Sequence, residues 1–213
     1  MAKLVVFGAS GATGRPIVEQ AVAAGHEVTA FVRDPATAPP GARVVSGDVL
    51  DAAAVDAAVA GHDVIVSALG HRRTAARNPW SRDTSPPDLF ARAGANLVDA
   101  ARRHHVTRLL FVGVHGAGDS RARTGWLYRW LLEHSSIRIA LADMNVMESL
   151  VAQSGLDWLV CRPVTLADGP ARGRCRVRDD RISSLAQIRR ADVAAFLLAH
   201  VDGPIAARTP SIA

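Results

Sequence analysis

Short apolar runs alternate with longer amphipathic stretches along most of the chain. Apolar runs bounded by turn residues are typical of strands buried on both faces, whereas amphipathic stretches of ten residues or more are typical of helices. We expect strands, with their turns, at 3–7, 27–32, 43–49, 63–70, 108–115 and 156–163. We expect helices at 15–24, 51–60, 88–105, 143–154 and 191–200.

This alternation of strand and helix predicts the fold class. Right-handed crossovers place successive strands parallel, with helices on both faces of the sheet. We therefore expect an α/β fold, a Rossmann-like doubly wound parallel sheet, with the whole of 1–213 in one domain. A chain of 213 residues, 49% of them hydrophobic, can bury one sizeable core.

Two segments interrupt the alternation, and we expect both on the substrate side of the sheet: 71–87 and 114–143. Segment 71–87 is too polar and too rich in proline for a helix, and a loop of that length is usually a lid or mobile. Segment 114–143 carries Trp126 and Trp130, which lie four residues apart and so on one helical face. We expect this pair to pack in the core, with a wall over the substrate pocket as the alternative.

The formal net charge of +5 comes almost entirely from arginine, since Lys3 is the only lysine. The sequence holds no recognisable nucleic-acid module, so we expect a solvated basic surface with some phosphate contacts and no nucleic-acid partner. No stretch approaches the roughly 18 apolar residues of a membrane helix, so we expect a cytoplasmic protein without a membrane partner. The sequence does not indicate an oligomeric state.

Cysteine and histidine give little sign of special chemistry. Cys161 and Cys175 form no zinc pattern; a disulfide between them is possible but unneeded, and we expect incidental thiols. Of the eight histidines only His104 and His105 adjoin, and neighbouring residues point to different faces of a helix. We expect no metal site.

The first expected strand runs into a turn with glycines at 8, 11 and 14, followed at once by a helix. In a dinucleotide-binding turn, Gly8 permits the tight turn, Gly11 lets the backbone approach a pyrophosphate, and Gly14 lets helix and strand pack closely. The start of the helix then presents free N–H groups to the anion. A glycine triplet alone is weak evidence, but this one has the strand, the helix and a second strand at the expected places. The turn therefore predicts dinucleotide binding.

The residue at the tip of the second strand decides between the two nicotinamide cofactors. An acidic residue there bonds a ribose 2′-hydroxyl, whereas an arginine accommodates a 2′-phosphate. Arg33 stands at this tip, followed by Asp34, so NADP is favoured. The alternative is that Arg33 only caps the sheet edge and Asp34 takes the ribose. Asp48, after the third strand, could meet an adenine edge or could serve as a turn aspartate.

Several short motifs together resemble the NADP-binding, NmrA-like branch of the atypical short-chain dehydrogenases, and within it the flavin reductases of the biliverdin reductase B type. The matching residues are Gly8-Ala-Ser-Gly-Ala-Thr-Gly14, Val32-Arg33-Asp34, Gly47-Asp48-Val49, Leu69-Gly70, Ser154-Gly155-Leu156, Arg162-Pro163 and Ala191-Asp192-Val193-Ala194. The resemblance runs nearly end to end. It implies phosphate contacts from Ser10, Gly11, Ala12 and Thr13, the 2′-phosphate on Arg33, adenine by Asp48 and Val49, ribose and pyrophosphate near Leu69, Gly70 and Arg72, and nicotinamide near Pro163.

The chain departs from this family on the substrate side. The Tyr-x-x-x-Lys pair of ordinary short-chain dehydrogenases is impossible, because the only tyrosine is Tyr128 and position 132 is leucine. Apolar or small residues also replace the family's serine pair, histidine and lysine, at Gly113-Val114, Val164 and Met144 respectively. The proton for a reduction would then come from water or from His115, the candidate catalytic residue at the end of the fifth strand. The alternative for His115 is a loop histidine bonded to a neighbouring carbonyl.

These features favour an NADPH-dependent reductase that transfers a hydride to a flavin, a quinone or a conjugated carbonyl compound. A nicotinamide can reduce such an acceptor with little help beyond positioning. Two alternatives remain open: a cofactor-retaining cyclase, isomerase or dehydratase of a polycyclic metabolite, and a non-catalytic NADP-sensing regulator.

Overall fold

A computed structural model describes the whole chain except residues 76–77, 179, 181 and 184, so part of the segment 71–87 lies outside the described residues. The strands are β1 Lys3–Phe7, β2 Glu27–Val32, β3 Arg43–Ser46, β4 Val64–Ser67, β5 Arg108–Val112, β6 Asp157–Pro163, β7 Thr165–Ala167, β8 Gln187–Arg189 and β9 Ser211–Ile212. The α-helices are α1 Gly14–Ala23, α2 Ala52–Val59, α3 Leu89–Arg103, α4 Trp126–His134, α5 Ile137–Ala152 and α6 Arg190–Leu198. Short 3-10 helices are η1 Pro35–Thr37 and η2 Gly118–Arg123.

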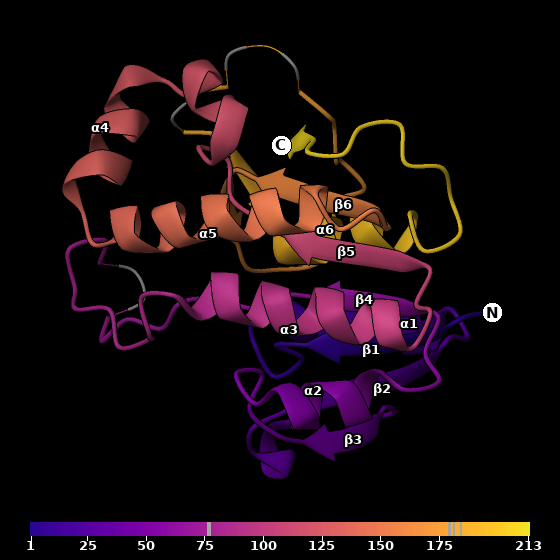
Figure 1. Cartoon of the computed structure of the whole chain (residues 1–213). Coiled ribbons are helices and arrows are strands. Elements are labelled where there is room, and N and C mark those ends of the chain that lie inside the picture. Colours follow the sequence, from indigo (N-terminus) through magenta and orange to yellow (C-terminus); the bar gives the residue numbers. More distant parts are fainter. Residues whose placement is uncertain (76–77, 179, 181, 184) are drawn as a thin grey trace.

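Seven strands form one sheet in the order β3-β2-β1-β4-β5-β6-β9, and each neighbouring pair is parallel. The first six follow the order of a doubly wound dinucleotide-binding sheet, which reverses direction between β1 and β4. The chain is thus a single-domain α/β protein with a Rossmann-like parallel sheet, as the alternation of strands and helices predicts (Figure 1).

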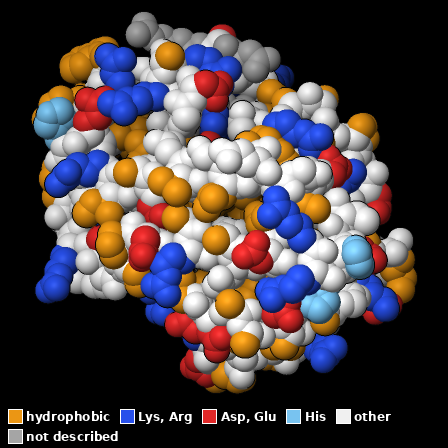
Figure 2. Space-filling view, in the orientation of Figure 1, with side chains coloured by type: hydrophobic (Ala, Val, Ile, Leu, Met, Phe, Trp, Pro, Cys, Tyr) orange, Lys and Arg blue, Asp and Glu red, His pale blue; other side chains and the backbone are white. Residues whose placement is uncertain are grey.

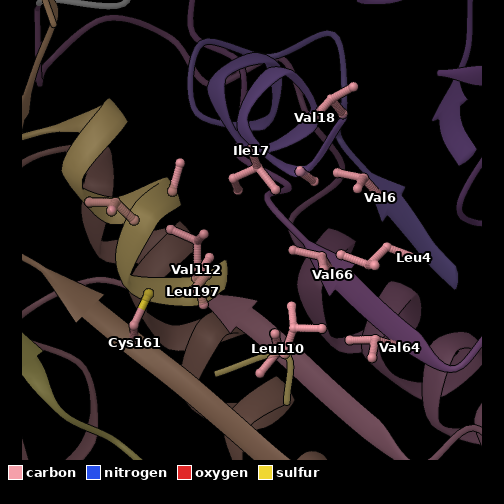
Figure 3. Close-up of a cluster of buried hydrophobic side chains, with 14 of the residues drawn as sticks. Leu4, Val6, Ile17, Val18, Val64, Val66, Leu110, Val112, Cys161 and Leu197 are labelled. Carbon is pink, nitrogen blue, oxygen red and sulfur yellow. The ribbon is translucent and has the colours of Figure 1, made fainter. Parts of the chain in front are cut away.

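Successive residues of each strand point to opposite faces, and helices cover both faces. Leu4 and Val6 of β1 pack on one face with Ile17 of α1 and Leu197 of α6 (Figure 3). Val5 and Phe7 lie in the other core with residues of α2, α3 and α5. Because both faces are covered, the strands read as continuous apolar runs rather than as an alternating pattern.

The structure differs from the expected elements in the second half of the chain. The helix expected at 143–154 begins six residues earlier, at Ile137, and α4 precedes it. The strand β9 pairs with β6 at Arg162 and Pro163, although a strand of two residues leaves no periodic pattern in the sequence. The strands β7 and β8 form a separate two-stranded sheet that the sequence pattern also did not predict.

The two cysteines are free thiols. Cys161 is fully buried in the core, and burial raises its pKa; burial also raises the pKa of Cys175, to about 11. No disulfide joins the two sulfurs, and their being incidental thiols stays a prediction.

Among the residues that the structure describes, no helix is long and apolar enough to cross a membrane. Basic and acidic side chains are interspersed over the face shown in Figure 2.

Candidate cofactor and active site

The parallel sheet brings most of the predicted cofactor contacts to one edge. Phe7 at the end of β1 is in register with Phe31 of β2 and with Ser67 of β4. The segments that follow these strands therefore emerge side by side, and they carry the glycine turn, Arg33 and the Leu69-Gly70 pair. Ligands of doubly wound sheets bind at this carboxyl edge, in the crevice where the strand order reverses.

Two glycines of the turn are required by close backbone contacts. Gly8 has φ of +76°, and a Cβ atom there would lie 2.6 Å from the carbonyl oxygen of Ala68. A Cβ atom on Gly14 would overlap the carbonyl oxygen of Gly8. These contacts match the tight turn and the close packing of helix on strand that a dinucleotide fingerprint requires.

The middle of the turn faces solvent. Gly11 and Ala12 are exposed, and Ser10 and Thr13 are half-buried. Thr13 is the N-cap of α1, but its side chain makes no capping hydrogen bond. The first N–H groups of a helix have no partner within the helix, so this start of α1 can donate to an anion that approaches the turn.

Arg33 is exposed where the chain leaves β2, and the next residue is already engaged. The carboxylate of Asp34 accepts a hydrogen bond from the backbone N–H of Ala36, at 3.0 Å, and so caps η1. The guanidinium of Arg15 donates to the carbonyl of Thr37 in the same short helix, at 3.0 Å. Asp34 is thus used in capping η1, and the contact of Arg33 with a 2′-phosphate, like the alternative that Asp34 takes the ribose, stays a prediction.

Asp48 and Val49 follow β3 at the same edge. The carboxylate of Asp48 accepts from the N–H of Leu50 at 3.0 Å, so Asp48 does act as a turn aspartate. This bond uses one carboxylate oxygen of an exposed residue, and an additional contact with an adenine stays a prediction. Val49 is buried, and its carbonyl accepts from the side-chain amide of Asn96 at 2.9 Å.

The described part of the segment after β4 forms a small antiparallel hairpin. A role of 71–87 as a lid or mobile loop stays a prediction. The N–H of Thr74 donates to the carbonyl of Arg82 at 3.0 Å, and the N–H of Thr84 donates to that of Arg72 at 2.8 Å. The hairpin follows directly from Leu69 and Gly70, and its strands carry Arg72 at the exposed surface.

The structure places His115 inside the protein, with 2% of its surface exposed. Its Nδ1 lies 3.1 Å from the hydroxyl of Ser211, and its Nε2 lies 3.3 Å from that of Thr124. Burial, and next the positive charges of Arg123 and Arg162, lower the pKa of His115. A buried, neutral imidazole bonded at both nitrogens favours a structural role, with hydroxyl partners instead of the expected carbonyl. The catalytic role of His115 stays a prediction.

We expect acid to destabilise the protein partly through His115. Because the folded state holds the pKa of His115 below the ordinary value of about 6.5, the unfolded chain binds a proton at a higher pH than the folded protein does. The contribution of neutral His115 to the free energy of unfolding is therefore complete above about pH 6.5 and is lost as the pH falls below that value. Urea unfolding of wild type and His115→Gln from pH 7 to 5 measures this pH dependence, and a steeper loss of stability in the variant would contradict the prediction.

If His115 were instead the general acid, His115→Ala would slow turnover about 10²-fold without weakening cofactor binding.

The tryptophans of α4 are not in the core, which corrects the expectation for Trp126 and Trp130. These side chains are 71% and 48% exposed. Leu132 and Tyr128 lie on the opposite side of the helix, since a separation of two residues is a rotation of about 200°; Leu132 is buried and Tyr128 is half-buried. Hydrophobic side chains accordingly reach the surface at the upper left of Figure 2, where α4 lies in Figure 1.

Two clusters of charged residues near the carboxyl edge were not predicted from the sequence. In the first, Arg162 of β6 is buried and bonds Glu148 of α5 and Asp119 of η2. In the second, His71 lies between Asp83 and Asp143. Each cluster joins residues that are far apart in sequence, and no local spacing marks them. Pro163, the predicted nicotinamide contact, follows Arg162 directly; it is buried and its carbonyl accepts from the N–H of His115 at 3.0 Å.

A small apolar cavity of about 10 Å³ lies between the sheet, α3 and α5. Its walls include Leu69, Phe90, Phe111 and Met144. A cavity of this size holds about one water molecule, so it is no pocket for an organic substrate. Its walls beside Leu69 are mostly apolar.

Comparison with known proteins identifies a family and several relatives. A family model described as NAD(P)H-binding matches residues 8–204. A 3-diazoavenalumate denitrifying reductase from a Streptomyces species is 33% identical to this chain, over 99% of this chain and 72% of its own length. An uncharacterized chloroplastic protein of Arabidopsis thaliana is 29% identical over 80% of this chain and 61% of its own length.

Solved structures share the fold. The anaerobillin reductase ChuY of Escherichia coli O157:H7 superposes with a TM-score of 0.79 at 25% identity, covering 99% of this chain and 96% of its own. A short-chain dehydrogenase/reductase from Veillonella parvula, solved in complex with NADP, has a TM-score of 0.77 at 14% identity, covering 99% and 94%. The second likeness concerns the fold alone.

Proposed function

This chain belongs to the NAD(P)H-binding family, and we propose that it is an NADPH-dependent reductase that transfers a hydride to a flavin, a quinone or a conjugated carbonyl compound. The observation that carries the proposal is the glycine turn, which opens toward solvent at the crevice between β1 and β4 beside an exposed arginine. Its relatives include proteins named as reductases, which supports reduction as the reaction class.

Different residues at the carboxyl edge would bind different parts of the cofactor. The N–H groups at the start of α1 would receive the pyrophosphate, and Arg33 would receive the 2′-phosphate. Leu69 and Gly70 would lie along the ribose, with Pro163 beside the nicotinamide. When bound, the cofactor supplies a hydride, which is its own chemistry. The protein contributes mainly orientation and an environment from which water is partly excluded.

The apolar character of the substrate side supports a conjugated acceptor. Met144 and Leu69 line the small apolar cavity near the carboxyl edge, and Val164 follows Pro163 as a buried residue. A planar conjugated molecule can stack on a nicotinamide against such walls and can take its proton from water. The proposal therefore needs no Tyr-x-x-x-Lys pair and no histidine at the reacting atoms.

Cofactor choice gives a direct prediction. NADPH should bind at least about tenfold more tightly than NADH, because a charge-assisted contact between Arg33 and the 2′-phosphate contributes roughly 1.5–3 kcal/mol. Arg33→Ala should remove most of that ratio. Arg43→Ala is the matched control. Arg43 is also an exposed arginine, but it is the first residue of β3 and so lies at the amino end of that strand, away from the carboxyl edge. Fluorescence titration of both cofactors measures the ratio, and equal wild-type affinities would refute the assignment of Arg33.

A further inference from the structure

His71 follows Leu69 and Gly70 directly, and its ring is held between two carboxylates. Its Nδ1 lies 2.7 Å from Oδ2 of Asp83 in the hairpin, and its Nε2 lies 3.3 Å from Oδ2 of Asp143 in α5. The three side chains are 5%, 9% and 3% exposed. The ring of Phe90, in α3, packs on the imidazole with 4.7 Å between the ring centroids.

The hydrogen-bonding capacity of these groups decides the charge of His71. An ionised carboxylate only accepts hydrogen bonds, so each ring nitrogen must donate to make both contacts. A neutral imidazole carries one N–H and can satisfy one of the two, whereas the imidazolium satisfies both. Only a protonated His71 would donate to both Asp83 and Asp143.

Asp143 connects this cluster to the start of α3. Its carboxylate accepts from the backbone N–H of Phe90 at 2.5 Å and from that of Ala91 at 2.9 Å, at the start of α3. His71 thus links four parts of the molecule: the segment leaving β4, the hairpin, α3 and α5. The segment leaving β4 contains the expected ribose and pyrophosphate contacts Leu69, Gly70 and Arg72.

We propose that protonated His71 is a positioning residue for the cofactor site, and that NADPH affinity falls when a rising pH removes its proton. This inference rests on the proposed function. The titratable groups that face His71 are Asp83 from the hairpin and Asp143 from α5, and α3 presents the uncharged ring of Phe90.

The direction of the effect follows from the contacts. After deprotonation, one ring nitrogen presents a lone pair to a carboxylate oxygen, and an attractive contact becomes repulsive. The segment 69–72 then loses one of the two side-chain contacts of His71, whereas the bonds of the Arg72 backbone to Thr84 and Ser85 remain. A looser segment must be ordered when the cofactor binds, and this lowers affinity.

The test is NADPH titration of the full chain from about pH 5.5 to 9, a range that spans histidine ionisation, with wild type and His71→Gln. Glutamine has no ionisation in this range, so the variant should bind more weakly at low pH and should lack the loss of affinity on raising the pH. We expect that loss in wild type to be about tenfold relative to the variant. His104→Gln is the matched control, because His104 also contacts a carboxylate, that of Asp56 at 3.0 Å, at the far end of α3. His104→Gln should show the same dependence of NADPH affinity on pH as wild type. Any pH dependence that comes from the cofactor's own phosphate is then present equally in all variants.

Parallel pH profiles for wild type and His71→Gln would overturn the inference. Absence of NADPH binding at every pH would instead refute the proposed function, so the two failures are distinguishable. If His71→Gln does not fold by circular dichroism, Asp83→Asn replaces it. The asparagine removes the charge on one side of His71, and the pH dependence should shrink; an unchanged profile would overturn the inference.

Discussion

Replacing Glu148 with alanine is expected to lower the free energy of unfolding by about 3–5 kcal/mol, because it leaves a buried guanidinium without its main partner. Arg162 is 3% exposed, and Glu148 accepts from its Nε at 3.0 Å and from its Nη2 at 2.6 Å. The remaining partner, Asp119, has a side chain that is 66% exposed and reaches only Nη1.

Glu133→Ala provides the matched control. Glu133 forms an ion pair of 2.6 Å with Arg121, but these side chains are 35% and 57% exposed. Exposed pairs contribute at most about 1 kcal/mol. Urea denaturation of wild type and both variants compares them, and similar small losses for the two variants would show that the Arg162 cluster is not the strong buried contact described above.

Gly11→Val is expected to weaken NADPH binding by about 100-fold or more, equivalent to roughly 2.7 kcal/mol, with the fold retained. The branched side chain would occupy the place through which a pyrophosphate must approach the turn. The fold should tolerate the change, because Gly11 is exposed, although the new Cβ would lie 3.1 Å from the carbonyl oxygen of Gly8 and require a small adjustment.

Two further substitutions separate binding from folding. Gly14→Val should disrupt the fold itself, since its Cβ would overlap the Gly8 carbonyl. Ala57→Val adds a branched side chain at an exposed position of α2 and should leave NADPH affinity unchanged. Calorimetric titration and thermal unfolding give the two readouts. A folded Gly11→Val protein with wild-type affinity would place the cofactor elsewhere.

The sequence predicted the first half of the fold well, because its signals there are local. Strands β1 and β2 are apolar runs with clear ends, and the turn at Gly8 and the helix that follows Thr13 leave little choice of element. The start of α5 was misplaced for the opposite reason. We expected α5 to begin at Asp143, but Asp143 lies within the helix and its carboxylate accepts from N–H groups of α3, across the structure.

In the candidate site, too, the features marked by local spacing were predicted and those that depend on distant contacts were not. The glycine turn and Arg33 are recognised by spacing within one strand-helix-strand unit. The clusters around His71 and Arg162 depend on contacts between the segment after β4, the hairpin, α5, β6 and η2, which only the packed molecule brings together. The burial of His115 likewise depends on Ser211, near the other end of the chain. The exposed Trp126 and Trp130 show that helical spacing identifies a face without saying whether the protein covers it.

The central claim, reduction by NADPH, is tested most directly by following the transferred hydrogen. The wild-type protein is incubated with NADPH deuterated at the transferable position of the nicotinamide and with a flavin, a quinone or a conjugated carbonyl acceptor, and the products are analysed by mass spectrometry and NMR. Hydride transfer to carbon predicts deuterium in the carbonyl product, and with every acceptor it predicts oxidised, deuterium-free cofactor in amounts equal to the reduced acceptor. Cofactor that stays reduced and fully deuterated, with or without conversion of the acceptor, would contradict the account and would point to a cofactor-retaining enzyme or a binding protein instead.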